Sequence, residues 1–198
     1  MKIIRMATPT DATQILDIYA PFIKNTTTSF EMEAPTVAQF SKRMEKYLSE
    51  APWLVCVEEE LVIGYAYASP HRGRAAYQWN REVSVYVHKE HYRKGIARVL
   101  YETLFQLLSF QGYTNALAGI VQPNEASVRF HTSLGFEHIG TYHNIGYKLG
   151  AWRDVAWYEH FLLDTPIEVP PTILSMKKLI ATDEYKTIFE IANQGMVQ

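Results

Sequence analysis

The feature that most constrains this chain is the junction between an alternating segment and a long helical one. Residues 82–87 place valines on one face and polar side chains on the other, which is typical of a strand with one buried face. Residues 95–111 place Ile, Val and Leu at helical spacing and end at Gly112, which predicts an amphipathic helix. The basic loop between them contains Gly95, so backbone N–H groups and the helix N-terminus can face one anion. The junction predicts an α/β (α+β) domain with a candidate phosphate site.

Spacing and turn signals predict the other elements. Helices are expected to begin after Thr8, Thr36 and Asn124, whose side chains can accept hydrogen bonds from the first N–H groups of a helix. Strands are expected where β-branched and aromatic residues are frequent, at residues 2–6, 53–57, 61–68, 116–121, 137–142 and 155–162. The order is therefore strand, two helices, three strands, helix, strand, helix and two strands, without an internal repeat.

Prolines near the end of the chain divide it into two parts. Pro166, Pro170 and Pro171 mark a linker, so we expect a domain at residues 1–163. Residues 164–198 form a C-terminal extension with a weak helix near residues 183–193. The sequence leaves open whether this extension folds back on the domain, exchanges between subunits or stays mobile.

Charge and composition exclude several classes of partner. The 198 residues carry a formal net charge of −2, so no overall basic field attracts nucleic acid or an anionic membrane. The longest uncharged stretch, residues 103–124, is too polar to span a membrane, and the N-terminus lacks the apolar core of a secretion signal. Cys56 is the single cysteine, which excludes an internal disulfide and agrees with a reducing cytoplasm. His88 and His91 lack a third converging ligand, so no metal site is predicted.

The loop at residues 86–97 reads Tyr-Val-His-Lys-Glu-His-Tyr-Arg-Lys-Gly-Ile-Ala. It resembles the acyl-CoA pyrophosphate loop of the GCN5-related N-acetyltransferases (GNAT), whose pattern is R/Q-x-x-G-x-G/A. Gly95 and Ala97 match this pattern, but Tyr92 stands where Arg or Gln is usual, which removes one phosphate ligand or transfers its role to Arg93. The resemblance implies that acetyl-CoA is held by Tyr92, Arg93, Lys94, Gly95, Ile96 and Ala97.

A second block, residues 123–136, resembles the part of the same family that contacts the pantetheine arm. Asn124 and Ser127 match the contacting positions, and the helix ends in Leu-Gly-Phe. The alternative is that Asn124 is only an N-cap and Gly135 only a C-cap. Both roles are compatible.

Three further stretches narrow the resemblance to the phosphinothricin N-acetyltransferase subfamily. They are residues 77–87, His131 and residues 146–155, and the similarity extends over about residues 3–162. It implies a GNAT fold, in which helices flank a mixed, mostly antiparallel sheet with splayed strands that bind acetyl-CoA. It also implies a small-molecule amine as acceptor and a homodimer.

Acetyl transfer to an amine requires groups that move protons. The resemblance places a general base at Glu82, and the alternative is an ion pair with Arg81. It places His131 near the departing sulfur, where an imidazole can donate a proton or help to deprotonate the amine. The alternative for His131 is a hydrogen-bonded packing role.

The remaining expectations concern backbone groups and the acceptor. Backbone groups of Val85, Tyr86 and Val87 are expected to hold the acetyl and pantetheine amides, with an N–H near Tyr86 or Val87 polarising the thioester oxygen. The resemblance also assigns acceptor-binding positions to Phe30, Glu31, Arg74, Tyr77 and Trp79. Arg74 can bind a substrate carboxylate through two hydrogen bonds, or it can be a solvated loop residue.

These observations predict an acetyl-CoA-dependent N-acetyltransferase. The expected acceptor is the amino group of a small amino-acid analogue such as phosphinothricin, methionine sulfoximine or methionine sulfone, attacked directly in a ternary complex. One alternative keeps the chemistry and changes the acceptor to a polyamine, an aminoglycoside or a protein N-terminus. Another alternative is a non-catalytic sensor that binds acyl-CoA.

Overall fold

The computed structural model describes residues 1–163 and 168–196, so Pro166 of the expected linker lies outside the described residues. The strands are β1 (Lys2–Met6), β2 (Trp53–Glu58), β3 (Leu61–Pro70), β4 (Asn80–Val87), β5 (Asn115–Val121), β6 (Glu137–Lys148) and β7 (Ala151–Phe161). The helices are α1 (Ala12–Asn25), α2 (Val37–Leu48), α3 (Ile96–Gln111), α4 (Glu125–Thr132), α5 (Met176–Ile180) and α6 (Asp183–Gly195). Short 3₁₀ turns lie at Pro9–Asp11, Ala75–Tyr77 and Lys89–His91. No helix within residues 1–163 and 168–196 is both long and apolar enough to cross a membrane.

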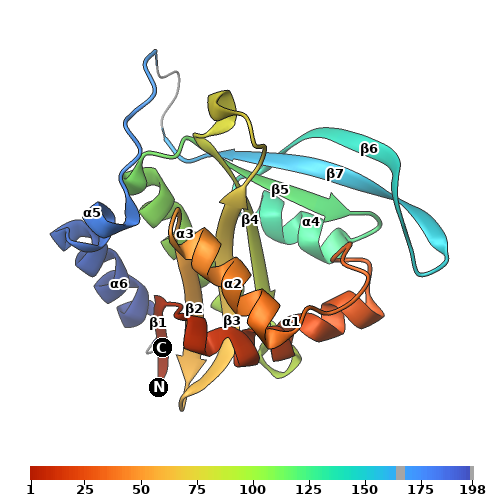
Figure 1. Cartoon of the computed structure of the whole chain (residues 1–198), viewed down its shortest axis with the longest axis horizontal. Coiled ribbons are helices and arrows are strands. Elements are labelled where there is room, and N and C mark those ends of the chain that lie inside the picture. Colours follow the sequence, from red (N-terminus) through yellow and green to blue (C-terminus); the bar gives the residue numbers. More distant parts are fainter. Residues whose placement is uncertain (164–167, 197–198) are drawn as a thin grey trace.

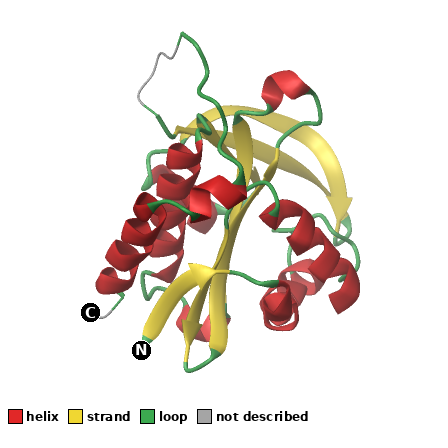
Figure 2. Ribbon diagram, turned by 60° about the vertical axis from the view of Figure 1, so that its left-hand side comes forward, coloured by secondary structure: helices red, strands yellow, loops and turns green. Residues whose placement is uncertain are grey.

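The strands form one mixed sheet in the order β1-β2-β3-β4-β5-β7-β6 (Figure 1). Neighbouring strands run antiparallel except for the parallel pair β4 and β5. Helices lie on both sides of this sheet (Figure 2). The apolar faces of α1 and α2 pack into one core cluster and that of α3 into another. The expected mixed, mostly antiparallel sheet with flanking helices is confirmed.

The helix ends follow the turn chemistry in the sequence. Thr36 and Gln39 form the expected capping box of α2, with the Gln39 N–H donating to Thr36 Oγ1 over 3.3 Å. Helix α3 lies between Gly95, with φ +77°, and Gly112, with φ +103°. These left-handed backbone conformations are strained for residues with a Cβ.

The β6–β7 hairpin is longer than the sequence indicates. Strand β6 continues to Lys148 rather than ending at 142, and β7 begins at Ala151 rather than at 155. The register between the two strands shifts between Tyr142 and Gly146. This irregularity interrupts the alternation by which a strand is recognised.

The C-terminal segment folds back on the domain. Helix α6 packs against α3 and β1, and the Asn193 side chain hydrogen-bonds both the N–H and the carbonyl of Ile4, at 2.6 and 3.1 Å. The helix expected near residues 183–193 is present as α6, whereas α5 was not predicted. Of the three arrangements that the sequence leaves open for the extension, residues 168–196 adopt the one that folds back on the domain.

Strands β4 and β5 separate soon after they meet. Their pairing covers only Asn80–Glu82 of β4, opposite 115–117 of β5. Beyond Glu82, β4 continues to Val87 beside β3, while β5 continues beside β7. One edge of β4 is therefore left without a strand partner from Val83 onward, which opens a gap in the sheet.

Candidate active site

A cavity of about 540 Å³ lies at the N-terminus of α3. It brings together Val87 and five of the six predicted loop residues, namely Tyr92, Arg93, Gly95, Ile96 and Ala97. Arg93 and Gly95 have φ angles of +61° and +77°, and these left-handed conformations form the turn into α3. Because the first N–H groups of a helix have no partner within it, this end of α3 offers donors and partial positive charge to an anion. Lys94 does not line the cavity.

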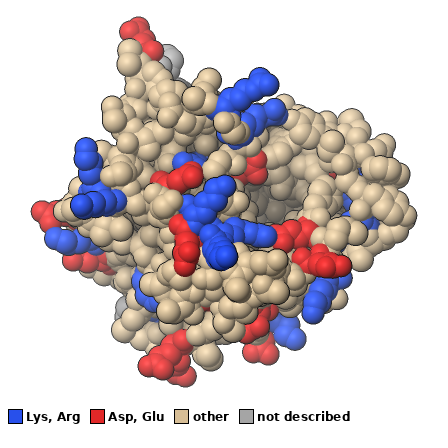
Figure 3. Space-filling view, viewed as in Figure 1, with Lys and Arg blue, Asp and Glu red and all other residues tan. Residues whose placement is uncertain are grey.

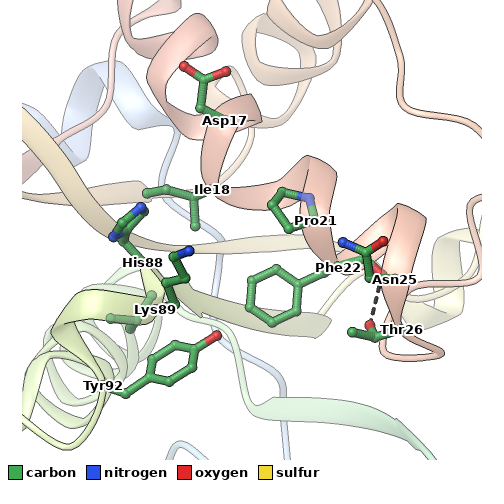
Figure 4. A pocket seen from close by; sticks show the side chains of 10 residues that line it. Asp17, Ile18, Pro21, Phe22, Asn25, Thr26, His88, Lys89 and Tyr92 are labelled. Atoms are coloured by element: carbon green, nitrogen blue, oxygen red, sulfur yellow. Dashed lines mark hydrogen bonds between the residues drawn. The ribbon is translucent and has the colours of Figure 1, made fainter.

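A neighbouring cavity of about 530 Å³ lies between α1 and the same loop, and it shares Val87 and Tyr92 with the first (Figure 4). In Figure 4 the Tyr92 ring extends from the loop toward Phe22 of α1 and Thr26, the residue that follows this helix. Tyr92, which stands where the family pattern has Arg or Gln, thus places a half-exposed aromatic ring between the two cavities. Lys89 and His88 line the α1 side.

The start of α4 shows the capping role that the sequence left as an alternative. The Asn124 side chain accepts a hydrogen bond from the Ser127 N–H over 3.2 Å. Ala126 and Phe130 of the same helix line the cavity at α3. Asn124 is therefore the N-cap of a helix that borders the candidate cofactor site.

The side chain of Tyr86 packs against other aromatic rings. Its ring lies 5.0 Å from that of Tyr19 and 5.1 Å from that of Phe22, centroid to centroid, on the α1 face of the sheet. In a strand, alternate residues direct their N–H and C=O groups to opposite edges. The His88 N–H donates to the Ile63 carbonyl of β3, so in this register the Tyr86 backbone also faces β3. The backbone groups of Val85 and Val87 therefore face the gap beside β5.

Glu82 lies where β4 and β5 separate, and its nearest polar partner is a histidine that the sequence analysis did not select. His71 Nδ1 lies 2.8 Å from Glu82 Oε1. Burial raises the pKa of Glu82, although the hydrogen bond from His71 and the positive charge of Arg72 oppose the shift. The net direction is upward, which makes this carboxylate a stronger base than an exposed one.

The alternative ion pair between Glu82 and Arg81 is wrong. The Arg81 guanidinium points to the other face of β4, where it lies 2.9 Å from Glu50 Oε2 and 2.6 Å from the Tyr113 hydroxyl. Successive side chains of a strand lie on opposite faces, so the side chains of Arg81 and Glu82 cannot contact each other. The register between β3 and β4 places Glu82 opposite Ser69, two residues before His71.

A cavity of about 320 Å³ adjoins His71. Its wall includes one cation, Arg72, and a group of aromatic side chains, Tyr77, Tyr142 and Trp157. Figure 3 shows the molecule hollowed between the β6–β7 hairpin and the body. Sequence reasoning selected Tyr77 for this region and missed His71, Arg72, Tyr142 and Trp157, because loop 71–77 and the hairpin meet only in the folded chain.

Four other residues expected to bind the acceptor do not line this cavity. Arg74 lines an adjacent groove of about 220 Å³, and the Trp79 indole donates to the Pro171 carbonyl over 2.8 Å. Glu31 is held by two hydrogen bonds from Arg43 and one from Tyr19. The Phe30 ring lies directly against Gly146, where any Cβ would collide with it.

His131 is 6% exposed, and both of its ring nitrogens have partners. Nδ1 lies 2.8 Å from the Ser127 carbonyl oxygen and therefore donates, which leaves Nε2 to accept from the Tyr101 hydroxyl at 3.3 Å. Burial lowers the pKa of His131, although the Ser127 carbonyl opposes the shift. The ring is thus neutral and enclosed, and the packing alternative accounts for all of these contacts.

Comparison with known proteins identifies the family. The model of the GNAT acetyltransferase domain matches residues 4–157. The chain belongs to the GNAT acetyltransferase family. It is an acetyl-CoA-dependent N-acetyltransferase, as the sequence resemblance predicted.

Relatives of this GNAT acetyltransferase include enzymes that act on amino-acid analogues. It is 38% identical over 164 residues to the phosphinothricin N-acetyltransferase of Streptomyces viridochromogenes, covering 82% of this chain and 90% of that one. It is 31% identical over 157 residues to the L-methionine sulfoximine/L-methionine sulfone acetyltransferase of Salmonella typhimurium, covering 79% and 92%. The crystal structure of a phosphinothricin acetyltransferase from Sinorhizobium meliloti in complex with acetyl-CoA superposes with a TM-score of 0.82 at 31% identity, covering 86% and 93%.

The residues of this GNAT acetyltransferase fit a polyanionic cofactor. The α3 N-terminus, Arg93 and Arg98 face the cavity at the loop, and the unpaired edge of β4 leads from that cavity toward Glu82. Among the residues that the structure describes, no three His, Cys, Asp or Glu side chains gather as metal ligands.

Proposed function

We propose that this enzyme acetylates the α-amino group of a small amino-acid analogue of the phosphinothricin, methionine sulfoximine or methionine sulfone type. The observation that carries the proposal is the cavity beside His71 and Glu82. Its volume of about 320 Å³ lies at the lower end of small-molecule sites, which favours a compact acceptor over an aminoglycoside. The Arg72 guanidinium lies in its lining, which favours an acceptor that carries an anion over a polyamine.

Glu82 is the proposed general base. An amino acid enters as an ammonium ion and must lose a proton before its nitrogen can attack. The raised pKa of Glu82 lets it take that proton, directly or through a water molecule. Acetyl-CoA supplies the activated acetyl group. Of the two main-chain donors expected near Tyr86 and Val87, the Val87 N–H is the one proposed to polarise the thioester oxygen, because the Tyr86 backbone faces β3.

Arg72 is the proposed ligand for the acceptor carboxylate, in place of Arg74. Its guanidinium lies over the Tyr77 ring at 5.6 Å and donates to the Tyr142 hydroxyl over 3.3 Å, so it is held at the cavity wall. A planar guanidinium can bind a carboxylate through two hydrogen bonds.

We also propose that Lys94, Asn124 and Ser127 contact the cofactor. His131 is the proposed donor of a proton to the departing sulfur. For His131 this role requires one nitrogen to leave its present partner. His131→Phe keeps the ring volume, so a role in proton transfer predicts a fall in kcat with unchanged acetyl-CoA affinity. An unchanged kcat would assign His131 to packing alone.

Homodimerisation is also part of the proposal. Apolar side chains of the β6–β7 hairpin are exposed in the single chain, among them Ile139, Ile145, Tyr147 and Trp152. Sedimentation equilibrium measures the oligomeric state, and a monomer at all concentrations would remove this part.

The acceptor is tested by incubating the purified protein with acetyl-CoA and a panel of amines while free thiol is measured. The panel contains phosphinothricin, methionine sulfoximine, methionine sulfone, a polyamine, an aminoglycoside and a peptide with a free N-terminus. Thiol release with the amino-acid analogues and not with the others is expected. Silence with all three analogues would refute the proposed acceptor class.

A further inference from the structure

Three side chains form a hydrogen-bonded chain from the wall of the acceptor cavity to the proposed base. The Arg72 Nε–H donates to His71 Nε2 over 3.3 Å, and His71 Nδ1 lies 2.8 Å from Glu82 Oε1. His71 is mostly buried, with 15% of its side chain exposed. We call this arrangement the Arg72–His71–Glu82 chain.

The direction of these hydrogen bonds follows from the donors available. A guanidinium can only donate, so His71 Nε2 must accept and carries no proton. The ring proton is therefore on Nδ1 and is donated to Glu82 Oε1. The group of this chain that is open to a further proton is thus Glu82, at its other oxygen, Oε2.

One other guanidinium lies close to this chain, because Arg74 lines a groove together with His71 and Arg72. Of these two guanidiniums, that of Arg72 hydrogen-bonds His71 and lowers the pKa of Glu82. Opposite Glu82, β3 and β5 place Ser69 and Leu117, which are uncharged. The other titratable groups facing the chain are the Tyr77 and Tyr142 hydroxyls, and the Trp157 ring lies 5.3 Å from His71. The neighbouring Arg81 is paired with Glu50 on the opposite face. Arg72 is therefore the cation whose charge reaches Glu82, by way of His71.

We propose that an acceptor carboxylate bound at Arg72 makes Glu82 a stronger base. This inference rests on the proposed function and specifies how the same site is regulated by its substrate. A carboxylate on Arg72 cancels the positive charge that favours the ionised form of Glu82. The acceptor ammonium then loses its proton to Glu82 Oε2 more readily: one N–H bond breaks, one O–H bond forms, and the nitrogen keeps the electron pair with which it attacks.

The consequence is a form of substrate selection that does not depend on affinity. An amine without a carboxylate leaves the charge of Arg72 in place and meets a weaker base. His71 acts in this scheme as a positioning residue, because it transmits the effect and does not itself take the proton.

The test is the pH dependence of the full-length enzyme with methionine sulfone as acceptor. The acidic limb of kcat/KM reports the free enzyme, and that of kcat reports the enzyme with its acceptor bound. Methionine sulfone and its carboxamide bring the same ammonium group to Glu82 and differ only in the carboxylate. We therefore expect the kcat limb with methionine sulfone to lie higher than that with the carboxamide by on the order of half to one pH unit, the size expected for removing one nearby charge.

Two variants separate transmission from mere packing. His71→Phe keeps a ring but removes both hydrogen bonds, so the difference between the limbs should vanish. His71→Asn can still donate from a position near Nδ1, so part of the difference should return. His138→Phe is the matched control, because His138 is exposed on β6 and bonds only Thr141 Oγ1 at 2.9 Å. Its profile should equal that of the unchanged protein.

Equal kcat limbs with methionine sulfone and with its carboxamide in the unchanged protein would overturn the inference and leave the proposed function intact. A difference that persists in His71→Phe would also overturn it. If His71→Phe does not fold, the comparison of methionine sulfone with its carboxamide in the unchanged protein still decides. Absence of thiol release with every amino-acid acceptor would refute the proposed function, and the inference with it.

Discussion

Replacing the buried Lys148 by Met should loosen the β6–β7 hairpin from the body of the enzyme. Lys148 is 3% exposed at the end of β6, and its ammonium donates to the Ile23 carbonyl at 2.7 Å and to the Ser29 carbonyl at 2.6 Å. Ile23 is in the last turn of α1, where helix carbonyls lack intrahelical partners. Met keeps the unbranched stem and removes only the charged donor.

The expected size of the effect follows from these contacts. Each hydrogen bond from a charged donor contributes about 1.5–3 kcal/mol, so the two lost bonds cost roughly 3–6 kcal/mol. Part of this is offset, because an ammonium group no longer has to be buried, at a cost of several kcal/mol. Two buried carbonyls are also left without this donor. A net destabilisation of about 2–4 kcal/mol remains, which lowers Tm by roughly 4–16 °C for a chain of this size.

Urea unfolding followed by tryptophan fluorescence measures the change in the free energy of unfolding. Lys186→Met is the control, since Lys186 is exposed in α6 and its pair with Asp183 is solvated; a change within about 0.5 kcal/mol is expected there. A Lys148→Met protein as stable as the original would refute the reasoning. It would mean that burying the ammonium costs as much as its two hydrogen bonds return.

Three further predictions concern the base, the loop and pH. Glu82→Gln should lower kcat by about 10²–10⁴-fold with unchanged acetyl-CoA affinity by calorimetry; a kcat within threefold of the original would remove Glu82 as base. Gly95→Val should weaken acetyl-CoA binding by about 5–30-fold, because φ +77° costs roughly 1–2 kcal/mol for a residue with a Cβ; unchanged binding would show that this conformation is not needed. Burial alone would raise the pKa of Asp11, but hydrogen bonds from Arg5 and Thr8 outweigh it and hold the pKa below its usual value. Ionised Asp11 therefore contributes to the free energy of unfolding at pH values above its unfolded-state pKa. This contribution is lost as the pH falls through the folded-state pKa of Asp11. Asp11→Asn should lower Tm at pH 7 and much less at pH 3, and an equal loss at both would contradict this.

The fold was predictable because its signals are local. Valine alternation before Val87, helical spacing after Gly95 and the Thr36 cap each act within a few residues, and each produces the expected element. The β6–β7 hairpin was predicted too short because its register shift interrupts the alternation.

The candidate site was predictable only in part, for a different reason. The loop at Gly95 is contiguous in sequence, so its residues could be assigned together. The partners of Glu82 come from loop 71–77 and from the β6–β7 hairpin, and nothing in the spacing of His71 or Trp157 indicates that they meet. Arg74 rather than Arg72 was selected because the direction of a loop side chain depends on the turn that carries it.

The short contact between β4 and β5 has a mechanical consequence. Three residue pairs join a four-strand half of the sheet to a three-strand half, so the seam between the halves is weak in backbone hydrogen bonds. If acetyl-CoA lies along that seam as proposed, its contacts with both halves would join them. Acetyl-CoA should therefore stiffen the whole molecule, and the amides of β5 should show the largest slowing of hydrogen exchange when it binds.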